Sequence, residues 1–346
     1  MTLVTSRGLN ISDQAILEFF SGHPSFTQIA NGAAGLGLNA SQLAYALSLG
    51  LGGTITAQAI NAWVGAPGSG YTWAPDGTLA HGTVTLSAPG SAAFTMIDAT
   101  GAQTLAIVST TSSGAPSTVT DTLTLSTTAH TTLDITGNVA LDLSPNWEIA
   151  LMSVKNVSAA SFNAGLHIYL YGNTNDLNIA VGNGNNIVVA GFGSDKIATG
   201  AGDDIIFAGR ASDIVDAGAG NDWIRGGPAK DVMTGGAGVD TYAYVFAYES
   251  SDSTGVDVIT DFAAGAGGDL LDFTALTHGA AAFAGNVNGA AAVNAALHAG
   301  TIEAVFDKTA GILHVDLDAN GMLDGVNDIA IQLTGVAQLA AANFIF

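Results

Sequence analysis

The residues with the clearest chemical potential are aspartates that recur every nine positions. A nine-residue frame fits residues 172–243 without an insertion, and six of its eight units carry aspartate at position six. The position-six residues are Leu177, Asn186, Asp195, Asp204, Asp213, Asp222, Asp231 and Asp240. Carboxylates and backbone carbonyls are hard oxygen ligands, which suit calcium because this ion accepts about six to eight oxygens in flexible geometry. Asn186 and the six aspartates are therefore predicted to be calcium ligands.

Other positions of the unit indicate how these aspartates could be held. Position two is glycine in every unit after the first, and glycine allows a sharp turn that aims carbonyl oxygens at one point. Position eight reads Ile179, Val188, Ile197, Ile206, Val215, Ile224, Met233 and Tyr242. A unit this short cannot bury its apolar side alone, so repeats of this kind stack. We predict a parallel β-roll in which two units form one coil, positions seven to nine form a strand, and position eight points inward.

The predicted roll places its aspartates in two columns, because each coil would span two units. One column contains Asp195, Asp213 and Asp231. The other contains Asn186, Asp204, Asp222 and Asp240. Without a cation each column is a ladder of like charges on a glycine-rich backbone, so folding is expected to depend on calcium.

This pattern resembles the repeats-in-toxin (RTX) nonapeptide Gly-Gly-x-Gly-x-Asp-x-apolar-x. The segments "GFGSDKIA" (191–198) and "GAGNDWIR" (218–225) are similar to the core of that motif. Residues 172–180 lack its aspartate and most of its glycines, so this unit is expected to be a cap. Asn186, Ala211 and Ala229 also depart from the motif.

The segment after the repeats extends the resemblance to residue 346. "DVITDFAAGAGGDLLDFTAL" (257–276) resembles the post-repeat region of RTX proteins that leave the cell by type I secretion. That family has an uncleaved C-terminal export signal, and "NFIF" (343–346) is similar to its ending. The resemblance implies a secreted, extracellular protein and the type I secretion apparatus as a partner. No cleavable N-terminal signal peptide is expected, since Asp13 and Glu18 interrupt the apolar segment that follows Arg7.

A second acidic loop, "DLDANGMLD" (316–324), follows an EF-hand-like pattern. Asp316, Asp318, Asn320 and Asp324 occupy positions 1, 3, 5 and 9 of that pattern. Position 12 is Asn327 rather than glutamate, and strand-like segments flank the loop. Calcium binding and a polar β-hairpin are therefore both open.

The remaining sequence predicts a mainly β protein with four regions. Residues 1–66 are expected to form a small helical domain, and residues 67–166 a β-rich domain that is either a sandwich or an irregular β-solenoid. Residues 167–250 contain the β-roll, and residues 251–346 a β-rich cap with the secretion signal. In the β-rich domain, strands are predicted at 82–87, 104–110, 120–127, 132–137 and 138–144.

Charge and composition exclude several classes of protein. The chain has 346 residues with 29 acidic and 7 basic side chains, for a net charge of −22. No Lys or Arg occurs between Gly8 and Val154, so nucleic-acid binding, which requires clustered cations, is not expected. The chain has no cysteine, and no apolar run is long enough for a transmembrane helix. No zinc-protease, lipase or phosphate-binding motif is present, so no catalytic residue is proposed and an enzyme is not expected.

Composition favours a structural role. The acidic, cysteine-free, Ala-, Gly- and Thr-rich chain resembles RTX-type surface-layer (S-layer) proteins of Gram-negative bacteria. This resemblance implies self-assembly into a lattice at the cell surface, with outer-membrane lipopolysaccharide as a further candidate partner. The alternatives are a secreted adhesin or ligand-binding module for glycan, heme or ice, and an enzyme with an unrecognised N-terminal active site.

Overall fold

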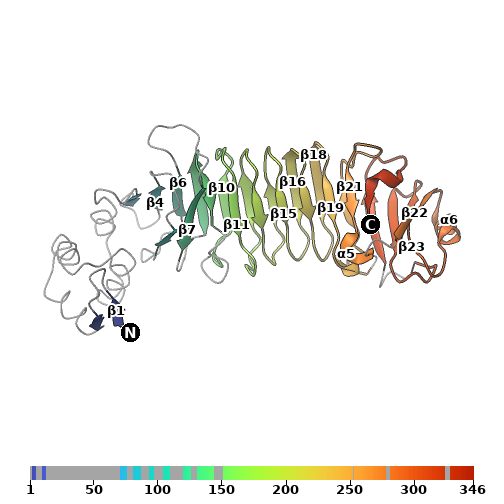
Figure 1. The fold of residues 1–346 in the computed structure, drawn as a ribbon, viewed down its shortest axis with the longest axis horizontal. Coiled ribbons are helices and arrows are strands. Elements are labelled where there is room, and N and C mark those ends of the chain that lie inside the picture. Colours follow the sequence, from blue (N-terminus) through green and yellow to red (C-terminus); the bar gives the residue numbers. More distant parts are fainter. Residues whose placement is uncertain are drawn as a thin grey trace. The chain divides into compact units, whose positions relative to one another are not determined.

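The computed structural model consists mainly of β-strands (Figure 1). It describes residues 2–4, 10–12, 71–75, 81–86, 93–96, 104–109, 120–125, 131–143, 151–251, 253–277, 281–323 and 328–346. The chain divides into two compact units, Met1–Val154 and Lys155–Phe346. Among the described residues, no helix is both long and apolar enough to cross a membrane.

The first unit contains two sets of parallel strands. One set is β4 (His81–Leu86), β6 (Thr104–Ser109) and β8 (Thr132–Gly137), with β3 (Tyr71–Pro75) antiparallel to β4. The other is β5 (Ala93–Met96), β7 (Thr120–Leu125) and β9 (Ala140–Asp142). The five predicted strands of this region are confirmed, and the parallel pairing is that of a solenoid rather than an antiparallel sandwich.

At the start of the chain, β1 (Thr2–Val4) pairs antiparallel with β2 (Asn10–Ser12). The helices predicted between residues 13 and 66 lie outside the described residues.

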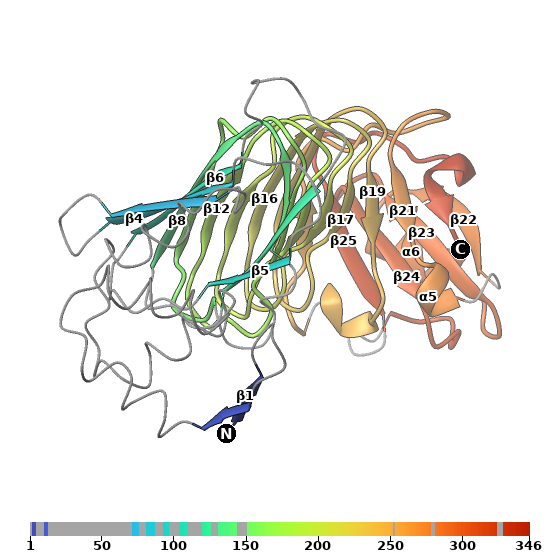
Figure 2. The same ribbon diagram turned by 60° about the vertical axis from the view of Figure 1, so that its left-hand side comes forward.

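The second unit begins with the β-roll. One of its sheets contains β10 (Asn156–Ala159), β12 (Asn178–Val181), β14 (Lys196–Ala198), β16 (Ile214–Ala219) and β18 (Val232–Ala237). The other contains β11 (Leu166–Tyr169), β13 (Ile187–Val189), β15 (Ile205–Phe207), β17 (Trp223–Arg225) and β19 (Thr241–Ala243). Figure 2 shows these strands stacked as successive coils. The pairs Ile197↔Val215 and Ile206↔Ile224 confirm the predicted register of 18 residues per coil.

The core of the roll is the stack of position-eight side chains. All eight are buried, with at most 1% of their surface exposed. Parallel register places each directly over its counterpart in the next coil, which gives a thin but continuous apolar core. The prediction that position eight points inward is confirmed.

The stack starts earlier than the repeat frame. Strand β10 pairs in parallel with β12, and β11 pairs in parallel with β13. Residues 172–180 therefore lie inside the stack, and the expectation that this unit is a cap is wrong. Strand pairing needs backbone register and a buried apolar side chain such as Ile179, and it does not need the aspartate or the glycines.

The C-terminal cap continues both sheets beyond the repeats. Strand β20 (Asp257–Ile259) pairs with β18, and β21 (Leu270–Asp272) pairs with β19. The first sheet then adds β25 (Ile329–Leu333), β24 (Ile312–Asp316), β23 (Ile302–Asp307) and β22 (Ala281–Val287), and the second adds β26 (Phe344–Ile345). The described helices here are short: η2 (Ala247–Glu249), α5 (Thr274–Thr277), α6 (Ala290–Ala296) and η3 (Ala341–Asn343).

Candidate metal centre

Each position-six aspartate uses one carboxylate oxygen to join two coils. Asp213 Oδ1 accepts the backbone N–H of Asp195 at 2.7 Å, and Asp222 Oδ1 accepts that of Asp204 at 2.8 Å. The same bond, from the residue 18 positions earlier, is formed by Asp195, Asp204, Asp231 and Asp240. All six aspartates are buried. The structure therefore brings the predicted residues together in the two predicted columns.

The second carboxylate oxygen has a different environment. The Oδ2 atoms of Asp204, Asp213, Asp222, Asp231 and Asp240 are buried and have no hydrogen-bond partner. A buried anionic oxygen without a partner is costly unless a cation or a proton neutralises it. Hard, anionic oxygens on a glycine-rich turn fit calcium, so these atoms are the ones that would hold the ion. At Asp195, by contrast, Oδ2 accepts the N–H of Gly191 at 3.1 Å.

Burial raises the pKa of these carboxyls above the ordinary aspartate value. Desolvation, reinforced by the charges of Asp231 and Asp195, raises the pKa of Asp213 to about 9. Desolvation and the neighbouring Asp257 raise the pKa of Asp231 to about 8. Desolvation also raises the pKa of Asp195, Asp222 and Asp240 to about 6 in each case, and raises that of Asp204. In the absence of calcium, the folded columns therefore keep their protons up to a higher pH than ordinary aspartates do.

The structure adds two aspartates that sequence reasoning missed. Asp257 Oδ1 accepts the N–H of Asp231 at 2.8 Å, and Asp269 Oδ1 accepts the N–H of Asp240 at 3.0 Å. Asp257 is buried and its Oδ2 has no partner, as in the repeats, whereas Asp269 Oδ2 accepts the N–H of Ala263. Each column thus extends by one carboxylate into the cap.

Their positions break the nine-residue frame, which is why the repeat did not identify them. One signal was present in the sequence: each aspartate is followed two places later by an apolar residue, Ile259 or Leu271. Both apolar side chains are fully buried, as position eight is in the roll.

The side-chain amide of Asn186 donates hydrogen bonds that an aspartate carboxylate at position six cannot form. Its Oδ1 accepts the N–H of Leu166 at 3.0 Å, which matches the coil-joining bond of the aspartates. Its Nδ2 donates to the carbonyl oxygens of Gly182, Gly184 and Thr199 and to Asp204 Oδ1, at 2.6–3.2 Å. Several oxygens of adjacent turns thus converge on one point, as the sequence predicted. One coil further on, the corresponding atom of Asp204 is an oxygen that cannot donate, so a cation has to replace the amide hydrogens. That Asn186 itself binds calcium stays a prediction.

Glycine is required where one turn stacks on the next. Gly218 has a φ of +102°, and a Cβ there would lie 1.9 Å from the carbonyl oxygen of Gly200, one coil away. The two alanines that depart from the motif, Ala211 and Ala229, adopt positive φ angles of 67° and 98°. These two turns therefore keep the left-handed backbone conformation of the glycine-containing turns, which strains the backbone of an alanine.

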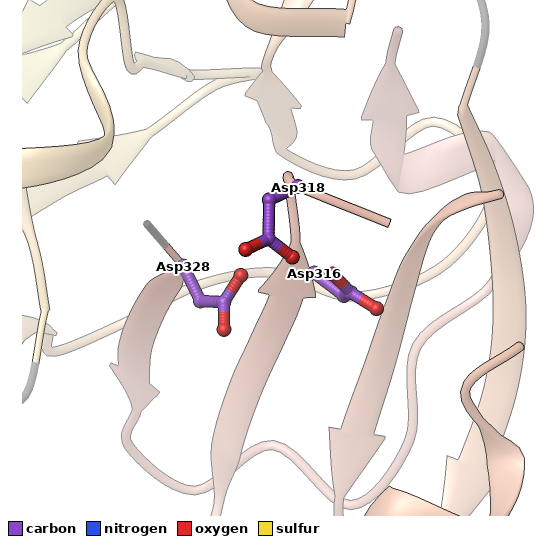
Figure 3. A group of neighbouring side chains, drawn as sticks. All are labelled: Asp316, Asp318 and Asp328. Atoms are coloured by element: carbon purple, nitrogen blue, oxygen red, sulfur yellow. The ribbon is translucent and has the colours of Figure 1, made fainter. Parts of the chain in front are cut away.

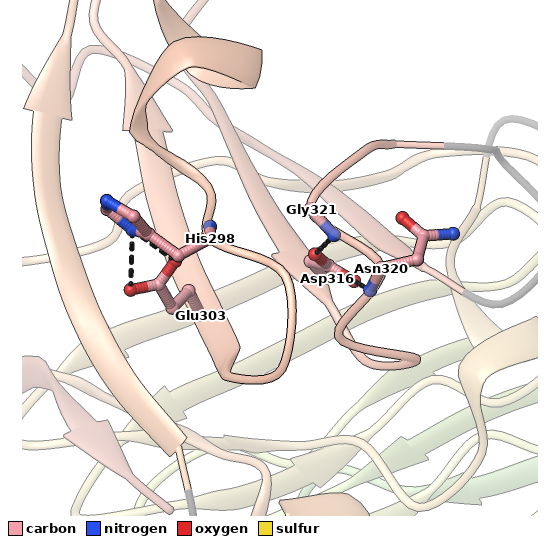
Figure 4. Close-up of polar contacts among 5 residues, drawn as sticks. All are labelled: His298, Glu303, Asp316, Asn320 and Gly321. Carbon is pink, nitrogen blue, oxygen red and sulfur yellow. Dashed lines mark hydrogen bonds and ion pairs between the residues drawn. The ribbon is translucent and has the colours of Figure 1, made fainter.

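The second acidic loop lies in the cap, between β24 and β25 (Figure 3). One carboxylate oxygen from each of Asp316, Asp318 and Asp328 lies within 4.8 Å of the others. Asp316 accepts the N–H groups of Asn320 at 3.3 Å and Gly321 at 2.8 Å (Figure 4). Asp328, which the sequence pattern did not include, supplies the third carboxylate, while the predicted ligand Asp324 lies outside the described residues. The antiparallel pairing of β24 with β25 makes this loop a hairpin connection, and calcium binding by it stays a prediction.

Comparison with known proteins identifies the repeats. Residues 181–215 and 209–242 match the family model of the RTX calcium-binding nonapeptide repeat (four copies). No curated protein matches the chain. Among solved structures, the chain is similar to the solution structure of the AlgE6R3 subunit from the Azotobacter vinelandii mannuronan C5-epimerase. The identity is 23% and the TM-score 0.25, over 53% of this chain and 77% of that one. Residues 181–242 therefore carry RTX calcium-binding nonapeptide repeats, and calcium is the cofactor of this β-roll.

Proposed function

We propose that this chain is a secreted structural protein that folds on extracellular calcium and assembles with copies of itself into a surface layer on a Gram-negative bacterium. The observation that carries the folding part is the array of buried, unpartnered carboxylate oxygens in the roll. A site that exists only in the folded state couples ion binding to folding, and the stabilisation grows with the ratio of free calcium to the dissociation constant. Extracellular calcium modules have dissociation constants of about 10⁻⁴–10⁻³ M. Such a roll would stay unfolded where calcium is scarce and fold after export.

Export through the type I secretion apparatus fits this behaviour, because an unfolded chain can pass through a narrow channel. The RTX repeats support this part of the proposal, since export of this kind is typical of proteins that carry them. Outer-membrane lipopolysaccharide is the proposed anchor.

The assembly part of the proposal relies on composition. No Lys or Arg occurs between Gly8 and Val154, and only 10% of all residues are charged. A weakly charged surface allows copies to approach closely, and a calcium-rigidified roll provides a fixed spacer. The chain is proposed to act without catalysis.

The test is direct observation of assembly. The purified full-length chain is brought to millimolar calcium and followed by light scattering and electron microscopy, with equal magnesium as the control. We expect ordered two-dimensional sheets that a calcium chelator dissolves. A monomer that persists at high protein concentration in calcium would overturn the surface-layer proposal and leave the secreted binding module as the better function.

A further inference from the structure

A groove of about 510 Å³ runs along one edge of the β-roll. Its lining includes Tyr171, Phe192, Phe207, Arg210, Arg225 and Phe246. Every lining residue belongs to the second unit and to the described part of the chain. The volume lies within the range of about 300–1,000 Å³ that is usual for ligand sites.

The groove is built by the repeat itself. Its lining includes Gly191, Gly209 and Gly227, which occupy position two in successive coils. Two columns of side chains line it and are here called its walls. The position-nine wall contains Val189, Phe207 and Arg225, with Tyr171 one coil before Val189, and the position-three wall contains Phe192, Arg210 and Pro228. Because successive coils are parallel-paired strands, the wall side chains recur about every 4.8 Å along the roll.

The opposite edge of the same roll provides an internal control. There, position nine reads Ala180, Ala198, Asp216 and Thr234, and position three reads Asn183, Ala201, Ala219 and Ala237. Both edges have the same nonapeptide turn and the same register. Small residues at these positions are therefore sufficient for the fold, and the large aromatic and cationic residues of the groove need another explanation.

Several of these aromatic rings are exposed in ordered arrangements. Tyr171, Phe246 and Tyr248 expose 58%, 45% and 48% of their surfaces. Tyr171 meets Phe192 edge to face at 5.2 Å between ring centroids, and Phe246 stacks on Tyr248 at 5.1 Å. Exposed aromatic surface that is fixed in this way is typical of a recognition site.

The charge of the groove is opposite to that of the protein. Two of the three arginines in a chain of net charge −22 line it. Arg225 is paired with the buried Glu249, with its Nε 2.9 Å from Glu249 Oε1. Arg210 stacks over the Phe192 ring at 4.7 Å and forms no ion pair within the described part of the chain. Its guanidinium is thus held in place and free to bind an anion.

We infer that this groove binds a linear anionic saccharide that lies along the roll axis. The negative face of an aromatic ring attracts the weakly positive C–H face of a pyranose, and a guanidinium binds a carboxylate with two parallel hydrogen bonds. The coil spacing of about 4.8 Å is close to the length of one pyranose in such a chain, so successive coils would meet successive sugars. The four coils of the position-nine wall correspond to a site for a tetrasaccharide. This inference requires the calcium-folded roll but does not depend on surface-layer assembly.

The first test measures affinity by isothermal titration calorimetry in saturating calcium, at a protein concentration where light scattering shows a monomer. The probes are oligoglucuronates of two to six residues, and cello-oligosaccharides of the same lengths are the matched neutral controls. We expect binding of the oligoglucuronates that strengthens up to four residues and then levels off, with little binding of the neutral chains. Equal binding of both series, or binding of neither, would overturn the inference.

The second test assigns the binding to the groove. Arg210→Gln and Tyr171→Ala change exposed side chains, and each is expected to weaken tetraglucuronate binding by about tenfold or more. Asn183→Ala and Thr234→Ala are the matched controls from the opposite edge and should leave affinity unchanged. An unchanged calcium midpoint in circular dichroism shows that each variant folds. If the groove variants abolish self-association but leave saccharide affinity intact, the groove is a contact between copies of this chain and the saccharide proposal is wrong.

Discussion

The two carboxylate columns of the roll come from one nonapeptide, yet they differ in chemistry. In the first column, the pKa is raised to about 9 at Asp213 and about 8 at Asp231, but only to about 6 at Asp195. In the second column, Asp222 and Asp240 reach only about 6. Desolvation is the largest cause at all five residues, so Asp213 and Asp231 are more strongly shielded from water than Asp195 or the second column.

Position along the stack therefore matters as well as the column. Asp195, Asp213 and Asp231 occupy the same position of the same nonapeptide, yet burial raises the pKa least at Asp195. The packing around each carboxylate, and not the repeat alone, sets how strongly it depends on a cation.

The largest expected effect is that of calcium removal at neutral or alkaline pH. With chelator at pH 8, Asp195, Asp222 and Asp240 would be ionised while buried, so the roll should unfold. Circular dichroism should show loss of most β-structure of the roll, restored by added calcium. A chelated spectrum at pH 8 identical to the calcium-bound spectrum would show that the columns do not require the ion.

Acid should partly replace calcium. Folding raises the pKa of these aspartates above the ordinary value of 3.8, so the folded roll binds protons more tightly than the unfolded chain. Their contribution to calcium-free stability is fully present below about pH 4 and decreases as the pH rises through the folded-state pKa values. Chelated protein at pH 5 should therefore retain more β-structure than at pH 8. The reverse order in a pH series of urea unfolding curves would contradict the raised pKa values.

A matched pair of variants tests the difference between the columns. Asp213→Asn and Asp222→Asn each keep the oxygen that joins two coils and remove one anionic ligand, so each should raise the calcium midpoint by about tenfold. Of the two variants, only Asp213→Asn should also reduce the pH dependence of that midpoint between pH 7 and 9, because the pKa is about 9 at Asp213 and about 6 at Asp222. Equal pH profiles for the two variants, measured by calcium titration in circular dichroism, would remove the distinction between the columns.

The column extension into the cap predicts a smaller effect. Asp257→Asn should raise the calcium midpoint and make the cap unfold at a lower urea concentration than the roll, since Asp257 joins the two through the N–H of Asp231. Asp176→Asn is the control, because Asp176 is an exposed carboxylate of the same roll that also accepts a backbone N–H. Hydrogen exchange should report faster exchange in β20 and β25 for the first variant alone.

The smallest expected effect concerns the N-terminal end of the second column. Asn186→Asp would replace an amide that donates to several oxygens with one more unpartnered carboxylate oxygen. Equilibrium dialysis should then show one additional bound calcium, with a fold that is slightly less stable in chelator. No change in stoichiometry would indicate that the turn at Asn186 cannot accept an ion.

Sequence alone determined the repeating part of this protein. A period of nine fixes which residues share a column, and the aspartate, glycine and apolar positions each have a local physical role, so the coil, its inward face and its ligand columns follow directly. Five of the described strands of residues 81–142 were also predictable from alternating β-branched residues, whereas β5 was not predicted. Their parallel pairing was not predictable, because pairing partners lie far apart in the chain.

Only the tertiary structure shows which residues outside the nine-residue repeat join the columns, the acidic loop and the groove. Asp257 and Asp269 join the columns because β20 and β21 continue the two sheets, although 26 and 29 residues separate them from their partners. Asp328 approaches Asp316 because a hairpin returns the chain to it. The groove needs side chains from successive coils on one edge, and its aromatic residues look unremarkable along the sequence. A local pattern specifies local geometry, whereas convergence of distant residues depends on register between strands, which is set by the packing of the whole unit.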